Sequence, residues 1–158
     1  MRLLGVDIGR KRIGLAVSDP SALVARPWRM VPAGRTPRMS ADLIAGLLPE
    51  LDDPLDDAPG VGAIVVGLPR RLDGSETDMT VPARELASAL RATTGLEVHL
   101  QDERLTSHEA EALLAERLPD WRQRKLLLDA ASAAVILQDY LDRRTGPGAA
   151  AEEGRPDA

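Results

Sequence analysis

Apolar and polar positions along the first third of the chain follow the period of β-strands. Residues 3–8 form a short apolar run, and apolar side chains alternate with small ones over residues 13–17, after a tight polar turn. This pattern predicts a β-hairpin. A third strand is expected over residues 23–31, and it should be irregular or lie at a sheet edge because Pro27 cannot donate a ladder hydrogen bond.

Helical spacing appears next and then alternates with strand patterns. Leucine and isoleucine recur at helical spacing after Ser40, the expected N-cap, as far as Leu51. The continuous apolar run VGAIVVGLP (61–69) predicts a central strand that is covered on both faces. An apolar stripe over residues 83–90 predicts a helix that ends at Gly95.

The last part of the chain predicts one more strand and two helices. LEVHLQ (96–101) alternates and should form a strand that ends at Asp102 and Glu103. Thr106 and Glu109 have capping-box spacing, which predicts a helix start, and residues 122–144 predict a long final helix.

The resulting element order is β-β-β-α-β-α-β-α-α. It predicts an α/β fold of the ribonuclease H-like class, with a mixed five-stranded sheet and helices on both faces. The sheet should consist of an antiparallel β-β-β meander followed by α-β-α-β. We expect one domain over residues 1–143 and a disordered tail over residues 144–158.

Composition and charge narrow the possible functions. The chain has 158 residues, of which 44% are hydrophobic and only 2% aromatic, so aromatic platforms for stacking single-stranded bases are scarce. A net charge of -5 argues against a protein that coats nucleic acid, but not against a nuclease whose acids hold cations. The absence of cysteine and the short N-terminal apolar run predict a cytoplasmic protein with no membrane span.

Three acids stand where a folding chain does not ordinarily place them. Asp7 lies in an apolar strand, Asp129 lies on the apolar face of the final helix, and Glu103 ends the alternating strand. Each has an ordinary structural explanation: a turn cap, a buried ion pair or a solvated strand end. In the expected fold, however, the three positions converge, and converging carboxylates repel one another unless cations lie between them. Oxygen ligands without cysteine favour Mg²⁺ or Mn²⁺, and we expect two ions.

Four segments carry a resemblance to a known family. GVDIGRKRIGLAVSD (5–19), IVVGLPRRLDGSE (64–76), QDERLTSHEA (101–110) and LLLDAASAAVILQDYL (126–141) resemble, in the same order, motifs of the YqgF/RuvX family of bacterial nucleases. That family belongs to the RuvC-like branch of the ribonuclease H-like superfamily. The resemblance covers about residues 1–143.

The resemblance implies a function and a site. It places the family's proposed catalytic positions at Asp7, Glu103 and Asp129, and it implies maturation of the 5′ end of 16S ribosomal RNA precursor. Precursor ribosomal particles are then expected partners. The family was earlier regarded as a Holliday junction resolvase. RuvC itself has a further acid one helical turn after its last aspartate, where this chain has Ser132, so the resemblance to a junction-cutting enzyme is weaker.

Basic side chains near these acids are candidates for contacts with nucleic-acid phosphates. They are Arg10, Lys11, Arg12, Arg70, Arg71 and Arg104. A basic hairpin tip is often only a solvated turn, and Arg104 beside Glu103 has an alternative role in orienting an acid.

Three other interpretations remain open on the sequence. Branched DNA is an alternative substrate to structured RNA, and a non-catalytic RNA-binding assembly factor is an alternative to an enzyme. The segment DIG followed by a hairpin also resembles the first phosphate loop of actin-like ATPases and sugar kinases. Those enzymes need two domains, for which 158 residues leave no room.

Overall fold

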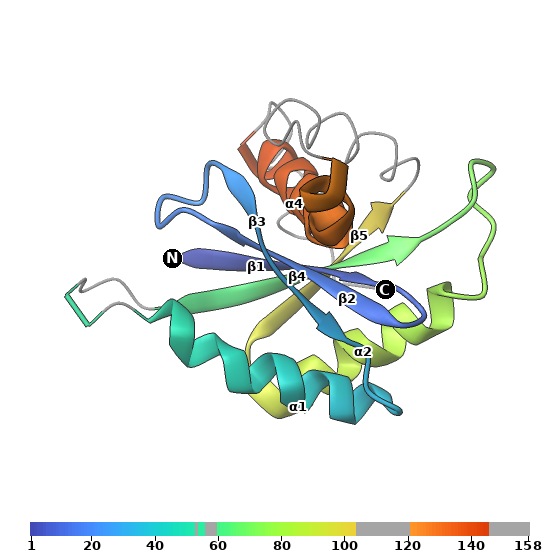
Figure 1. Ribbon diagram of the computed structural model, residues 1–158, viewed down its shortest axis with the longest axis horizontal. Coiled ribbons are helices and arrows are strands. Elements are labelled where there is room, and N and C mark those ends of the chain that lie inside the picture. Colours follow the sequence, from blue (N-terminus) through green and yellow to red (C-terminus); the bar gives the residue numbers. More distant parts are fainter. Residues whose placement is uncertain (53, 56–59, 104–120, 146–158) are drawn as a thin grey trace.

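A five-stranded sheet forms the middle layer of the protein, with strands in the order β3-β2-β1-β4-β5 (Figure 1). The computed structural model describes residues 1–52, 54–55, 60–103 and 121–145, with the backbone alone for 121–129 and 145. The described elements are β1 (Arg2–Ile8), β2 (Arg12–Ser18), β3 (Ala25–Pro32), α1 (Pro37–Leu47), the 3₁₀ turn η1 (Leu48–Leu51), β4 (Val61–Pro69), α2 (Thr80–Thr94), β5 (Glu97–Glu103) and α4 (Trp121–Thr145).

The strand pairing confirms the predicted meander and the parallel strands that follow it. β1 pairs antiparallel with β2, and β2 pairs antiparallel with β3, whereas β4 is parallel to both β1 and β5. β3 is an edge strand, and its register shifts because Trp28 is an extra residue opposite Leu15 and Ala16. The irregular edge predicted from Pro27 is therefore present as a bulge.

Two apolar layers hold the helices on the sheet. α1 and α2 cover one face, and α4 covers the other (Figure 1). Along β1, Leu4 and Val6 pack in the α1/α2 layer, while Leu3 packs in the α4 layer. This alternation is that of a strand buried on both faces. Gly5 allows α4 to approach closely, because a Cβ there would lie 2.8 Å from the Ala133 carbonyl oxygen.

The first helix begins earlier and ends earlier than predicted. Thr36 is the N-cap and its side chain accepts a hydrogen bond from the Met39 N–H, so the prediction of Ser40 as the N-cap was wrong. Ser40 is buried inside the helix, and its hydroxyl accepts a bond from the Gly34 N–H at 2.9 Å. Pro49 stands in the 3₁₀ turn that follows, so the predicted helical pattern through Leu51 does not continue as an α-helix.

The later elements follow their sequence patterns closely. β4 spans the whole predicted run, and α2 ends at Gly95, whose φ of 70° is the left-handed conformation expected of a C-cap glycine. α4 matches the predicted final helix within a residue at each end. The expected helix start at Thr106 and the expected tail lie outside the described residues. No helix among the described segments has the length and apolar character needed to cross a membrane.

Candidate active site

Three parallel strands end at the same edge of the sheet, and two of the predicted acids lie there. Asp7 is the penultimate residue of β1, and Glu103 is the last residue of β5. β4 lies between these strands and is parallel to both. The fold therefore brings Asp7 and Glu103 to the carboxyl ends of strands, which is where open α/β sheets place their ligand sites.

Asp7 points to the face of the sheet that α4 covers. Leu3 packs in the α4 layer, and Gly5 lies directly against Ala133 of α4. Side chains alternate between the two faces of a strand, so Asp7 shares the face of Leu3 and Gly5. The Asp7 residue is half-buried in the described structure.

Glu103 points to the same face and reaches back over β4. It is paired in register with Pro69, yet its Oε2 lies 2.8 Å from the point that a Cβ on Gly67 would occupy. The Cδ1 atom of Ile136, from α4, lies 2.5 Å from that point. The carboxylate of Glu103 therefore lies between the sheet and α4, where Oε2 is shielded from solvent.

Glu103 borders the space above Gly67, and Asp7 lies on the same face of the sheet, on β1 beside β4. Asp7 and Glu103 stand two strands apart, about 10 Å across the sheet, and Glu103 lies two residues farther along the strands than the level of Gly67. Val6 pairs with Val66, and Asp7 and Gly67 are the next residues of these two strands. The Glu103 side chain spans most of the middle strand from the other side. The Glu103 carboxylate thus lies over a position of β4 that has no side chain, on the face of the sheet that also carries Asp7.

The third predicted acid has a backbone position that fits this arrangement. Asp129 stands one helical turn before Ala133 and two turns before Ile136, the α4 residues that contact β1 and β4. Farther along α4, Gln138 accepts a bond from the Ala25 N–H at 2.8 Å, beside the opposite edge of the sheet. α4 therefore runs away from the strand ends that carry Asp7 and Glu103, which we call the acidic edge. Residue 129, near the start of α4, lies toward that edge. The Asp129 side chain lies outside the described part of the structure.

The chemistry of this edge fits a hard divalent cation. Mg²⁺ and Mn²⁺ prefer carboxylate oxygens, and Asp7 and Glu103 present them on one face of the sheet. Glycine at position 67 leaves room above β4 that any other residue would fill. Among the side chains that the structure describes, no three potential metal ligands form a cluster, and Asp129 is not among those side chains.

The predicted basic residues of the hairpin tip lie beside this edge. Arg10 forms an ion pair with Asp78, which belongs to the segment between β4 and α2. Both side chains are exposed, at 75% and 62%. Lys11 and Arg12 are also exposed, and neither takes part in an ion pair with another described residue.

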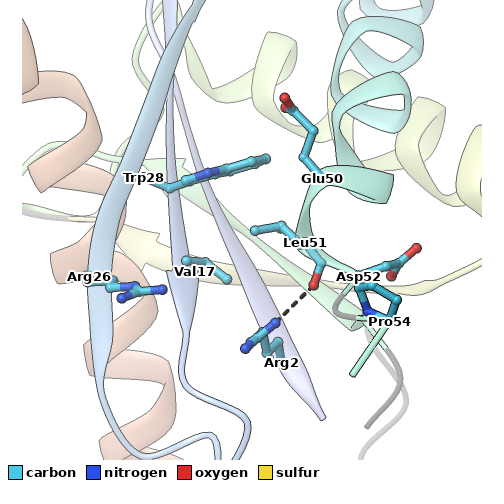
Figure 2. Close-up of a pocket in the computed structure, with 8 residues that line it drawn as sticks. All are labelled: Arg2, Val17, Arg26, Trp28, Glu50, Leu51, Asp52 and Pro54. Carbon is cyan, nitrogen blue, oxygen red and sulfur yellow. Dashed lines mark hydrogen bonds between the residues drawn. The ribbon is translucent and has the colours of Figure 1, made fainter. Parts of the chain in front are cut away.

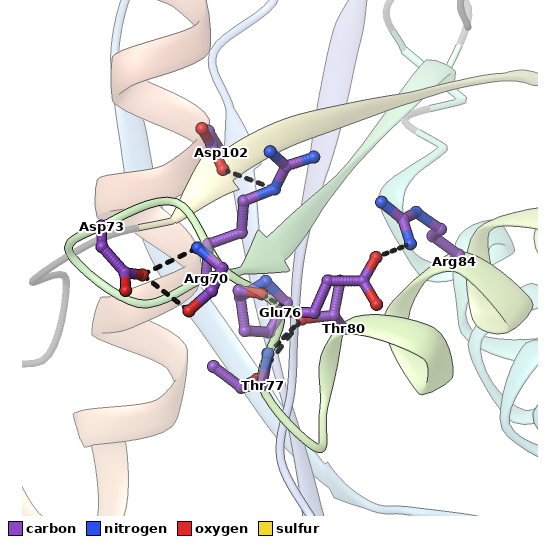
Figure 3. Close-up of polar contacts among 9 residues, drawn as sticks. Arg70, Asp73, Glu76, Thr77, Thr80, Arg84 and Asp102 are labelled. Carbon is purple, nitrogen blue, oxygen red and sulfur yellow. Dashed lines mark hydrogen bonds and ion pairs between the residues drawn. The ribbon is translucent and has the colours of Figure 1, made fainter.

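Arg70 lies next to Glu103 and bridges β4 and β5. Its Nε is 3.4 Å from Oδ1 of Asp102 (Figure 3). Its backbone N–H donates to the Glu103 carbonyl oxygen at 3.3 Å. Arg71 is exposed, and its N–H donates to the Ser75 carbonyl oxygen at 2.9 Å. Arg104 lies outside the described residues.

The segment between β4 and α2 is held in one conformation by its own polar groups. Asp73 accepts hydrogen bonds from the N–H and the hydroxyl of Ser75, at 2.9 and 2.6 Å (Figure 3). These bonds, the hydroxyl bond first, hold the pKa of Asp73 below its usual value. At the far end, the buried Thr80 hydroxyl donates to the Pro69 carbonyl oxygen at 2.5 Å. The segment is thereby fixed against the end of β4.

Sequence reasoning missed three residues that shape this region: Gly67, Asp78 and Thr80. For Gly67 a signal was present, because a glycine inside a buried strand often marks a close approach of another group. The partner of Asp78 is 68 residues away in sequence, so local pattern gave no indication of the ion pair.

A polar hollow of about 350 Å³ lies at the other end of the sheet (Figure 2). Its lining comprises Arg2, Val17, Arg26, Trp28, Glu50, Leu51, Asp52 and Pro54. Arg2 begins β1 and donates a hydrogen bond to the Leu51 carbonyl oxygen at 2.9 Å. Five residues of extended strand, about 17 Å, separate Arg2 from Asp7, so the hollow is distinct from the acidic edge.

Comparison with known proteins agrees with this geometry. Residues 1–143 match the family model described as RuvX, Holliday junction resolvase. A relative from Anaeromyxobacter sp. (strain Fw109-5), named "Putative pre-16S rRNA nuclease", is 44% identical over 144 residues, which is 91% of this chain and 98% of that protein. A protein of the same name from Pelotomaculum thermopropionicum is 37% identical over 147 residues, 93% of this chain and 90% of its own length.

A solved structure supports the predicted fold class. The Fowlpox virus resolvase, in complex with Holliday junction DNA, aligns with a TM-score of 0.56 at 10% identity. The alignment covers 92% of this chain and all of the viral chain (100%), so the two proteins share a fold. The five-stranded ribonuclease H-like fold is therefore confirmed. By its family match and its similar relatives, the chain belongs to the RuvX (YqgF) family of nucleases.

Proposed function

We propose that this protein is a nuclease that depends on a divalent cation and processes the 5′ end of 16S ribosomal RNA precursor. The observation that carries the metal dependence is the placement of Asp7 and Glu103 on one face of the sheet, at the carboxyl ends of β1 and β5 on either side of β4, with the Glu103 carboxylate over Gly67. The names of the relatives support the substrate, because proteins at 37% and 44% identity are named for pre-16S rRNA.

The proposed site holds Mg²⁺ or Mn²⁺ through Asp7, Glu103 and Asp129. Two such ions, when bound, supply an activated water and stabilise the leaving oxygen of the phosphodiester. Asp7 and Glu103 provide oxygen ligands from rigid strands, which hold ligands more precisely than loops do. Oε2 of Glu103 is shielded from solvent, so water competes less for that oxygen.

The basic residues at the rim bind and orient the RNA backbone. Lys11 and Arg12 are exposed at the hairpin tip, where a strand of RNA crossing the acidic edge would meet them. Arg70 holds Asp102, the neighbour of Glu103, while Arg71 points its charge to solvent from the same segment. These contacts offset the net charge of -5 only locally, so binding should depend on the cations at the site as well as on the arginines.

The test is cleavage of end-labelled precursor 16S RNA with Mg²⁺, Mn²⁺ or EDTA. We compare the wild type with Asp7→Asn, Glu103→Gln and Asp129→Asn. The matched control is Asp42→Asn, which makes the same change on the exposed face of α1, across the sheet from the acids. We expect metal-dependent cleavage that each of the three site variants reduces at least 100-fold and that Asp42→Asn leaves unchanged.

A four-way DNA junction in the same assay tests the second candidate, which the description of the family favours. Cleavage of the junction without cleavage of the RNA would establish a resolvase in place of an RNA-processing enzyme. Binding of precursor RNA or of precursor ribosomal particles without cleavage of either substrate would leave a non-catalytic assembly factor. A cytoplasmic location, where such precursors would be met, stays a prediction.

A further inference from the structure

Gly67 lies under the carboxylate of Glu103 and under the end of Ile136. A Cβ at position 67 would be 2.8 Å from Oε2 of Glu103 and 2.5 Å from Cδ1 of Ile136. Real Cβ atoms essentially never come within 3.0 Å of another heavy atom, so any side chain here would force its neighbours to move. The glycine and the two side chains above it are therefore fitted to one another.

Gly67 lies on the strand between the two strands that carry the predicted acids, which connects its close packing to the site. β4 separates β1, which carries Asp7, from β5, which carries Glu103. In the β4–β5 ladder Glu103 stands beside Pro69, so its side chain leans two residues back along β4 to reach Gly67. Gly67 follows Val66, the residue of β4 that pairs with Val6, and Val6 directly precedes Asp7 on β1. The carboxylate of Glu103 can lie over the middle strand, on the side of Asp7, because β4 has no side chain at this point.

We propose that Gly67 is a positioning residue of the metal site: its missing side chain is the space in which the Glu103 carboxylate lies. This inference rests on the proposed function, since it assigns Gly67 to the same cation. A methyl group at position 67 would push Oε2 away by about 0.6 Å before ordinary contact at 3.4 Å is restored. Ligands of Mg²⁺ lie at about 2.0–2.1 Å in near-octahedral geometry, so a displacement of that size removes one ligand from range.

A purely structural role for Gly67 makes a different prediction. If the glycine only made room for Ile136, then shortening Ile136 would restore both the unfolding temperature and the Mn²⁺ affinity that Gly67→Ala lowers. Ile136→Val removes Cδ1, the atom at 2.5 Å, and leaves the clash with the Glu103 carboxylate in place. The pair of substitutions therefore separates packing from the positioning of the ligand.

The experiment measures Mn²⁺ affinity by isothermal titration calorimetry and the unfolding temperature without metal. The variants are Gly67→Ala, Ile136→Val, the double variant Gly67→Ala/Ile136→Val and Glu103→Gln. Gly46→Ala on α1 is the matched glycine control, because a Cβ there meets no atom within 4 Å.

We expect Ile136→Val and Gly46→Ala to bind Mn²⁺ as the wild type does. Gly67→Ala should bind at least 10-fold more weakly. The double variant should recover unfolding temperature but not affinity, and it also serves if Gly67→Ala alone does not fold. Wild-type affinity in the folded double variant would overturn the positioning role and leave the proposed function intact. Absence of Mn²⁺ binding by the wild type, or unchanged binding by Glu103→Gln, would overturn the proposed metal site and this inference with it.

Discussion

Replacing Thr80 with valine tests how the segment between β4 and α2 is fixed beside the acidic edge. Thr80 is fully buried at 0% exposure and begins α2. Its hydroxyl donates to the Pro69 carbonyl oxygen at 2.5 Å and accepts from the Thr77 N–H at 2.8 Å (Figure 3). Valine has the same shape but no hydroxyl, so the substitution removes both bonds and leaves the packing volume unchanged.

The magnitude follows from the two backbone groups that lose their partner. A buried donor or acceptor without a partner costs about 1–3 kcal/mol, and both of these contacts are part-buried, so the free energy of unfolding should fall by roughly 2–4 kcal/mol for the two groups together. For a chain of 158 residues, 1 kcal/mol corresponds to about 2–4 °C in Tm. Thr80→Val should therefore lower Tm by roughly 5–15 °C.

Two variants serve as controls in urea unfolding followed by circular dichroism. Thr80→Ser keeps the hydroxyl and should lose only about 1 kcal/mol for the missing methyl group. Thr94→Val makes the same change at the other end of α2, where the hydroxyl donates to the Leu90 carbonyl oxygen at 2.6 Å and accepts from the Leu96 N–H at 3.2 Å. Thr94 itself is only half-buried, so water can replace these bonds. This substitution should cost about 1 kcal/mol. The reasoning is refuted if Thr80→Val and Thr80→Ser have the same stability within about 0.5 kcal/mol.

Three further predictions concern other polar contacts. The pKa of Asp19 is lowered, first by the hydrogen bond from the Val24 N–H, so its carboxylate stabilises the fold above pH 3.8 and this contribution is lost as the pH falls through the lowered pKa. Asp19→Asn should therefore be less stable than the wild type at pH 7, and urea titrations should show the difference vanishing in acid. The exposed pair Arg10–Asp78 should give a coupling of no more than about 1 kcal/mol in a double-mutant cycle. In a filter-binding assay, Arg10→Ala should also reduce the slope of the logarithm of the RNA-binding constant against the logarithm of salt concentration by about one. An unchanged slope would show that Arg10 does not contact the RNA. Ser18 is buried and bonds β1 through its hydroxyl at 2.9 Å, so Ser18→Ala should cost about 1–3 kcal/mol in urea unfolding.

The sequence by itself determined where the strands lie, because their apolar residues repeat with the period that burial in a sheet requires. The alternating and continuous apolar runs placed all five strands, because a strand buried on one or both faces must repeat its apolar side chains with a fixed period. The left-handed C-cap at Gly95 was also predictable from a single residue, since glycine adopts a positive φ without steric cost.

The N-cap of α1 could not be predicted, because the sequence offers two suitable capping residues close together. Ser40 and Thr36 are both good N-caps, and the choice of Thr36 depends on Ser40 being buried, where its hydroxyl binds the Gly34 N–H. Burial of that serine is a property of the packed α1/α2 layer. Sequence alone carries no information on which of two neighbouring capping residues faces solvent.

For the candidate site, the sequence indicated which residues belong to it, and the tertiary structure decided how they are arranged. Asp7 was identified from the sequence because a carboxylate inside an apolar strand is costly and therefore informative. Glu103, at a strand end where acids are usually solvated, was singled out because the expected fold brings it toward Asp7 and because it matches a family motif. Their relative position was decided by tertiary structure: the order β1-β4-β5 sets them two strands apart, and Gly67 on the middle strand leaves the space that Glu103 occupies. The ion pairs Arg10–Asp78 and Arg70–Asp102 join residues 68 and 32 positions apart, which only the packed chain brings together. A one-dimensional pattern reports which side chains avoid water, whereas the distance between two charges depends on the path of the backbone between them.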